Sequence, residues 1–116
     1  MTSKLAKYSI LDLNGDWSRP SIKFFRSSGL YGYIAWLIIL NAHFEKKNIT
    51  SEQLAYQIKK YASRRTVINY ISKGTQGGFL YKNISQNDKR ITFVKPTKIT
   101  IKEYTEWAAE FIKSVV

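Results

Sequence analysis

The stretch SRRTVINYISKG, residues 63–74, predicts a short helix with an unusual first turn. Ser63 is a suitable N-cap, and Val67 begins a set of apolar side chains at helical spacing. Arg64 and Arg65 occupy the first turn, where the helix dipole favours anions and opposes cations. We therefore expect these two arginines to serve a partner that is itself an anion.

The positive charge of the chain is concentrated around this helix. The 116 residues include 19 Lys+Arg and 8 Asp+Glu, which gives a formal net charge of +11. Residues 59–102 contain 11 of the basic side chains and one acid, Asp88, and so carry +10 of that charge. A concentration of this degree favours a surface that binds a polyanion over a solvated basic face without a partner.

Another helix is predicted from Thr50 onward, directly before the helix that begins at Ser63. Together they make residues 50–76 a helix-turn-helix. Thr50 and Gln53 match a capping box, in which each side chain bonds to the backbone of the other residue. We expect this helix to end near Lys60. The following helix is expected over 64–73 or slightly beyond, because Gly74 and Gly77 disfavour its continuation.

A β-hairpin is predicted over residues 78–96, which we call the wing. FLYKNI (79–84) and RITFV (90–94) alternate in hydropathy, and the polar SQND between them is typical of a turn. Pro96 is expected to close the second strand, because proline has no N–H for a ladder bond. A helix-turn-helix followed by a wing places its second helix in the major groove of DNA.

The predicted DNA-binding residues follow from this geometry. Arginine can donate two hydrogen bonds to guanine, and asparagine can pair in a similar way with adenine. In the helix that follows Ser63, and at its cap, the candidates are Ser63, Arg64, Arg65, Thr66, Asn69 and Lys73. In the wing they are Lys82, Lys89 and Arg90, which would meet phosphates or enter the minor groove. Whether Arg64 and Arg65 contact bases or phosphates stays open at this point.

Long apolar helices are predicted on both sides of these elements. The first covers 20–47, begins at Ser18-Arg19-Pro20 and has a possible break at Ser28-Gly29. The last covers 100–116 and begins with a second capping box, Thr100 and Glu103. Residues 1–17 form an N-terminal arm with a turn signal at Asn14-Gly15.

Both flanking helices carry much apolar surface for a chain of this length. Part of that surface can pack within the domain, and part can form a seam with a second copy. The predicted dimer interface comprises Ile34, Leu37, Ile38, Tyr104, Trp107, Phe111 and Ile112. A membrane span is disfavoured, because the dense apolar centre YIAWLIIL (33–40) is much shorter than the roughly 20 residues that a spanning helix needs.

Several motifs resemble those of the MarR-type winged helix-turn-helix regulators. The run Ser63–Val67 is similar to the family's S-x-x-T-V, Gly78-Phe79-Leu80 to its glycine-apolar-apolar strand start, and Asp88-Lys89-Arg90 to its D-x-R wing motif. The resemblance covers about residues 50–97. It implies a homodimer with interlocked terminal helices and a role in transcriptional regulation. It also implies that Arg90 reaches into the minor groove and that Asp88 helps to hold the wing.

These observations predict a single domain, mainly α with a small β-hairpin (α+β), and sequence-specific binding of double-stranded DNA. The alternative is an architectural, partition or replication protein of a plasmid, virus or chromatin that binds DNA with little sequence preference. An enzyme is disfavoured, because the chain has no cysteine, one histidine (His43) and no recognisable nucleophile–base–acid set. No cofactor, metal or membrane partner is expected, and no small-molecule effector is identified. The N-terminus lacks a secretory signal, so we expect a cytoplasmic protein associated with the nucleoid.

Overall fold

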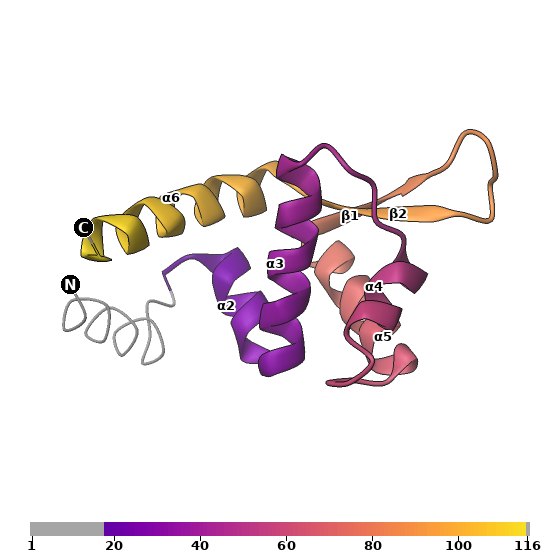
Figure 1. Ribbon diagram of the computed structural model, residues 1–116, viewed down its shortest axis with the longest axis horizontal. Helices are drawn as coiled ribbons and strands as arrows, with labels where there is room; N and C mark the ends of the chain where they lie inside the picture. The colour runs from indigo at the N-terminus through magenta and orange to yellow at the C-terminus, as the bar shows by residue number, and fades with distance from the viewer. Residues whose placement is uncertain (1–17, 116) are drawn as a thin grey trace.

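The computed structural model describes residues 18–115, which form five α-helices and one antiparallel hairpin (Figure 1). The arrangement is the predicted α+β class. The predicted arm over residues 1–17, with its Asn14-Gly15 turn, lies outside the described residues. In chain order the elements are α2 (Pro20–Ser27), α3 (Leu30–Phe44), α4 (Ser51–Gln57), α5 (Arg64–Gln76), β1 (Leu80–Ile84), β2 (Thr92–Pro96) and α6 (Lys98–Val115).

The first long helix is broken at Ser28-Gly29, where the sequence indicates a break, so the predicted helix over 20–47 is two helices. Gly29 separates α2 from α3 with a φ of +87°, a left-handed conformation that suits glycine. The hydroxyl of Tyr70, from α5, donates to the carbonyl oxygen of Gly32 at 3.1 Å and lies 3.4 Å from that of Phe25. Helix α3 ends at Phe44, three residues before the predicted end.

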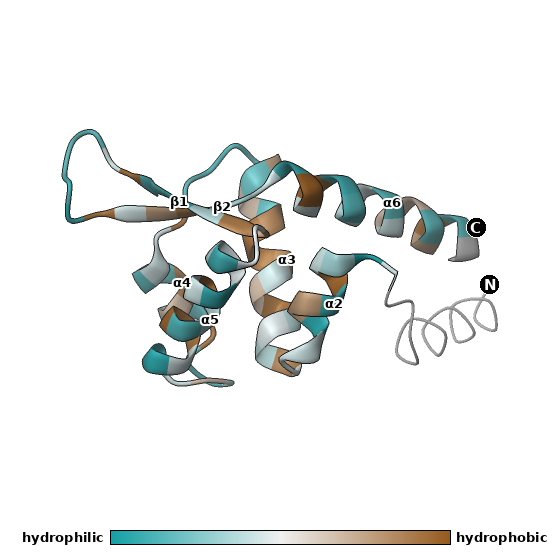
Figure 2. Cartoon of the chain, turned by 180° about the vertical axis from the view of Figure 1, so that it is seen from behind, coloured by the Kyte–Doolittle hydropathy of each residue, from teal (hydrophilic) through white to brown (hydrophobic). Residues whose placement is uncertain are grey.

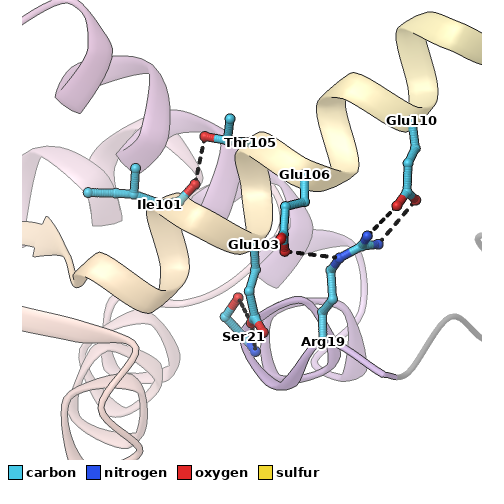
Figure 3. Close-up of polar contacts among 7 residues, drawn as sticks. All are labelled: Arg19, Ser21, Ile101, Glu103, Thr105, Glu106 and Glu110. Atoms are coloured by element: carbon cyan, nitrogen blue, oxygen red, sulfur yellow. Dashed lines mark hydrogen bonds and ion pairs between the residues drawn. The ribbon is translucent and has the colours of Figure 1, made fainter.

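The start of α2 depends on a residue that is distant in sequence. The helix begins within the predicted Ser18-Arg19-Pro20, but its N-cap is Arg19, whose side chain makes no capping bond. Instead, the buried carboxylate of Glu103, on α6, accepts hydrogen bonds from the N–H of Ser21 at 2.9 Å and from its hydroxyl at 2.6 Å (Figure 3). Glu103 thereby satisfies a backbone donor that the first turn of a helix leaves without a partner.

The same contact shows that the predicted capping box of Thr100 and Glu103 is wrong. Helix α6 begins at Lys98, two residues earlier than expected. The hydroxyl of Thr100 donates to the carbonyl oxygen of Phe79 at 2.7 Å, at the start of the wing. Thr100 therefore fixes the wing to α6.

The core forms where α2, α3, α5 and α6 meet. Trp36 of α3 is fully buried, stacks on Phe25 of α2 and makes an edge contact with Trp107 of α6 at 5.3 Å between ring centroids. Figure 2 shows the apolar colouring concentrated on α3, which lies at the centre of the molecule. None of the helices within residues 18–115 is both long and apolar enough to cross a membrane.

The wing projects away from the helices as an antiparallel ladder (Figure 1). Its register runs from Leu80↔Pro96 to Ile84↔Thr92, so the second strand covers 92–96 instead of the predicted 90–94. The turn extends to Ile91, whose carbonyl oxygen accepts from the N–H of Ser85 at 2.9 Å. Pro96 is the last residue of β2, as expected.

Candidate nucleic-acid interface

The first helix of the predicted helix-turn-helix begins as its sequence indicates. The N–H of Gln53 donates to the Thr50 hydroxyl at 3.0 Å, and the N–H of Thr50 donates to the Gln53 side chain at 2.9 Å. Helix α4 ends at Gln57, before the predicted end near Lys60. The carbonyl oxygen of the buried Ile58 then accepts from the backbone at 61 and 62, which makes residues 58–62 a compact turn.

Helix α5 has one buried face and one exposed face. Its buried residues are Val67, Tyr70, Ile71 and Gly74. Arg65, Asn69 and Lys73 recur every four residues and are exposed. Such spacing places them on one stripe of the helix. This stripe contains three of the predicted DNA-binding residues.

The cap of α5 involves two further predicted residues. The hydroxyl of Ser63 accepts from the N–H of Thr66 at 3.2 Å, and the two hydroxyl groups lie 2.9 Å apart. Ser63 is exposed, and Thr66 is half-buried. Both side chains therefore fix the first turn from which Arg64 and Arg65 project.

Helix α5 runs through Gly74 and ends at Gln76, with Gly77 as its C-cap, which agrees with the expected end slightly beyond residue 73. Gly74 is buried against the wing. A Cβ atom at this position would lie 2.8 Å from Cδ1 of Leu80 and 3.2 Å from Cε2 of Phe24. The glycine thus permits the close approach of β1 to α5.

Arg64 differs from Arg65 in its partner. Nε of Arg64 donates to both carboxylate oxygens of Glu52, at 3.1 and 2.9 Å, and Nη2 donates to Oε1. The ion pair joins the first turns of α4 and α5. These hydrogen bonds lower the pKa of the Glu52 carboxyl, and the carboxylate raises the pKa of Arg64. Arg65 makes no ion pair with any residue in the described part of the chain.

In the wing, Asp88 holds Arg90 by three contacts. Its carboxylate accepts from the backbone N–H of Arg90 at 3.0 Å, and from Nε and Nη2 at 3.2 and 3.3 Å. These bonds lower the pKa of the Asp88 carboxyl. The Arg90 side chain remains 91% exposed. Lys82 and Lys89 are also exposed.

A groove connects the wing with the start of α4. It has a volume of about 420 Å³ and is lined by Thr50, Ser51, Glu52, Lys82, Arg90, Ile91 and Thr92. The main chain holds its two walls together, because the N–H of Val94 donates to the carbonyl oxygen of Ile49 at 2.9 Å. The predicted wing residues Lys82 and Arg90 therefore share one surface with the first turn of α4.

The predicted dimer residues have different environments within the single chain. Trp107 is only 8% exposed and packs on Trp36, so its own chain buries it. Ile112 is 59% exposed. The remaining predicted residues, Ile34, Leu37, Ile38, Tyr104 and Phe111, are partly buried. An open apolar groove is lined by Ile34, Leu37, Ile38, Asn41, Phe44, Gln57 and Tyr104.

Glu52 is the main site residue that the sequence did not predict. It pairs with a side chain 12 positions away, and the length of the intervening turn decides whether the two can meet. The available signal for Glu52 was an acid in the first turn of a capped helix. The helix dipole alone favours an acid there, so the sequence gives no sign of a partner. Within residues 18–115 no group of three or more His, Cys, Asp or Glu side chains could hold a metal ion.

Comparison with known proteins identifies the fold. No family model and no curated protein matches the sequence. Among solved structures, the heme complex of the heme sensor protein PefR from Streptococcus agalactiae superposes with a TM-score of 0.57 and 15% sequence identity, over 85% of this chain and 65% of that one. Heme-free PefR superposes with a TM-score of 0.51 and 14% identity, over 97% of this chain and 98% of that one.

This chain therefore spans just under two thirds of the PefR chain in the heme complex. At such identities the likeness concerns the fold. That fold is the winged helix-turn-helix which the MarR-type resemblance implies.

Proposed function

We propose that this chain is a dimeric transcriptional regulator that binds double-stranded DNA in a sequence-specific manner. The observation that carries the proposal is the exposed stripe of Arg65, Asn69 and Lys73 on a helix whose opposite face is buried. Charged and amide donors on one accessible helix face suit base edges and phosphates, both of which are rich in acceptors.

The docking that we propose follows the winged-helix geometry. The first turn and exposed stripe of α5 enter the major groove. The wing lies beside this helix, and Lys89 and Arg90 at its turn contact the phosphate backbone or enter the minor groove. The exposure of Arg90 supports this arrangement, because its guanidinium bonds Asp88 through Nε and Nη2 and still keeps its Nη1 donors for a partner.

A second copy of the chain completes the proposed regulator. The apolar surfaces of α3 and α6 supply the interface, and a two-fold axis then presents two copies of α5. Two such helices favour a palindromic site whose halves are about one helical turn, roughly 34–36 Å, apart. The proposed location is the cytoplasm, at the nucleoid, and no catalytic activity is proposed.

Selection of bound fragments from a random duplex pool tests this function. We expect one palindromic sequence to be enriched, and the protein to prefer it over random duplex by about 10³ or more at physiological salt. Lys113→Ala is a suitable control, because this residue is exposed and belongs to the last turn of α6. Figure 1 shows that this end of α6 lies far from the wing. It should leave the enriched sequence unchanged. Equal affinity for all duplexes would contradict sequence-specific regulation and favour the architectural or partition role.

A further inference from the structure

Arg64 is held by one carboxylate at the edge of a strongly basic surface. Glu52 accepts from Nε and Nη2 of the guanidinium, and the two side chains remain 63% and 67% exposed. The pair is therefore accessible to DNA. These hydrogen bonds lower the pKa of the Glu52 carboxyl and so favour its ionised form.

The pair leaves part of the guanidinium available. An arginine side chain has five N–H donors in a fixed plane, and the contacts with Glu52 use one on Nε and one on Nη2. The two donors on Nη1 and one on Nη2 remain. A guanine edge needs two of them, for O6 and N7. The carboxylate fixes the plane in which these donors lie.

The same carboxylate changes how Arg64 interacts with phosphate. A phosphate contact is sequence-independent and depends mainly on net positive charge. The paired Arg64 has a negative charge in direct contact, which weakens its attraction for a phosphate at any position. Arg65, one residue later, makes no ion pair with the described side chains, so no neighbouring carboxylate offsets its positive charge. The two adjacent arginines are thus electrostatically different.

We propose that Glu52 is a specificity-determining residue, which positions Arg64 for a base edge and prevents it from binding phosphates indiscriminately. This inference rests on the proposed DNA-binding function. Glu52 itself makes no base contact in this scheme and acts through Arg64. Removal of its charge releases Arg64 as an ordinary mobile cation.

The test is the ratio of affinities for the selected site and for random duplex, measured for wild type and Glu52→Gln. We expect the variant to bind random duplex more tightly, with a salt slope steeper by about 0.9, the contribution of one additional phosphate contact. The specificity ratio should fall by about 5-fold or more, the lower end of what a bidentate arginine contact supplies.

Two further variants separate this role from general effects of charge or folding. Glu45→Gln removes the same charge from an exposed acid paired with Lys47 at the end of α3, and should leave ratio and slope unchanged. In an Arg64→Gln background, Glu52→Gln should have no further effect on either quantity. The circular dichroism melting curve of each variant shows whether it is folded.

Each outcome has a distinct meaning. An unchanged ratio in folded Glu52→Gln, or an equal effect of Glu52→Gln with and without Arg64, would overturn the role of Glu52 while leaving the DNA-binding function intact. If wild type binds no duplex, or binds all duplexes equally, the proposed function and this inference both fail.

Discussion

At the scale of single residues, the two arginines in the first turn of α5 have different explanations. The sequence suggests that both oppose the helix dipole and await an anion. The structure supplies an anion for Arg64 within the chain, since Glu52 reaches it from α4. Of these two arginines, only Arg65 has no ion-pair partner among the described residues. An exposed cation at a helix N-terminus is tolerable in the free protein and becomes favourable when a phosphate arrives.

Gly74→Ala is predicted to destabilise the protein. The new methyl group would lie 2.8 Å from Cδ1 of Leu80, which is buried and has little room to move. Overpacking of this kind costs about 1–3 kcal/mol, and the better helix propensity of alanine returns up to about 1 kcal/mol. We expect a net loss of about 1–2 kcal/mol in the free energy of unfolding, measured by urea denaturation.

The neighbouring exposed position provides the control for this effect. Lys73→Ala should change the free energy of unfolding by less than about 0.5 kcal/mol. A Gly74→Ala variant as stable as wild type would mean that β1 does not approach α5 as closely as the structure has it.

Glu103→Ala is predicted to loosen the contact between α2 and α6. The substitution leaves the buried N–H and hydroxyl of Ser21 without their acceptor (Figure 3). An unsatisfied buried group costs about 1–3 kcal/mol, so thermal unfolding should occur at a lower temperature. Glu106→Ala removes a more exposed acid one turn away, whose ion pair with Arg19 is 3.7 Å long. That control should cost less than about 1 kcal/mol. Equal losses in the two variants would contradict the capping role of Glu103.

At the scale of elements, local signals predicted α4 and α5, and distant contacts determined what the sequence missed. The Thr50–Gln53 capping box and the Ser63 cap lie within three residues of their partners, so sequence spacing is sufficient to identify them. Glu103 also follows a threonine by three residues, yet it bonds Ser21, 82 positions away. Nothing local distinguishes these two cases, because the packing of α6 on α2 makes the choice.

The same distinction explains the predicted and missed parts of the candidate site. Arg65, Asn69 and Lys73 are predicted from the sequence by residue type and by their place in a predicted helix, and all three are exposed on α5. The close packing of β1 on Gly74 depends on how the wing folds back onto α5, and the pairing of Arg64 depends on the conformation of the turn over 58–62. Both are tertiary features, which the local spacing of residues in the sequence does not reveal.

Arg90→Ala tests the wing as an element. The side chain is 91% exposed and its partner Asp88 lies in the same turn, so the fold should be unaffected. We expect weaker binding to selected and random duplexes alike. The salt slope should fall by at most about 0.9, because the Asp88 carboxylate on Nε and Nη2 weakens a phosphate contact as Glu52 does for Arg64. Lys113→Ala removes one positive charge at the other end of the molecule and should leave the slope near the wild-type value. A loss confined to the selected site would contradict a phosphate contact and favour the minor-groove alternative.

At the scale of the whole molecule, one group of exposed apolar side chains lies on α3 and α6, while others, such as Tyr56 and Ile84, lie on α4 and the wing. The groove beside α3 includes Phe44, which is 51% exposed, and Tyr104 of α6 lines the same groove. Further along α6, Phe111 is half-buried and Ile112 is exposed. Exposed apolar surface that continues over two helices suits a protein–protein contact. A dimer formed there would leave α5 and the wing of each copy free for DNA.

Ile112→Glu is predicted to separate that dimer. In the single chain Ile112 is 59% exposed, so a charged side chain there is solvated and the monomer should fold as before. In a dimer the same charge would be buried without a partner, which is strongly unfavourable. Sedimentation at micromolar concentration should give a dimer for wild type and a monomer for the variant. Ile99→Glu, at the other end of α6 and 40% exposed, should remain a dimer. Affinity for the palindromic site should fall with Ile112→Glu and persist for an isolated half-site, because only the coupling of two α5 helices is lost. A wild-type protein that sediments as a monomer would remove both the interface and the palindrome from the proposed function.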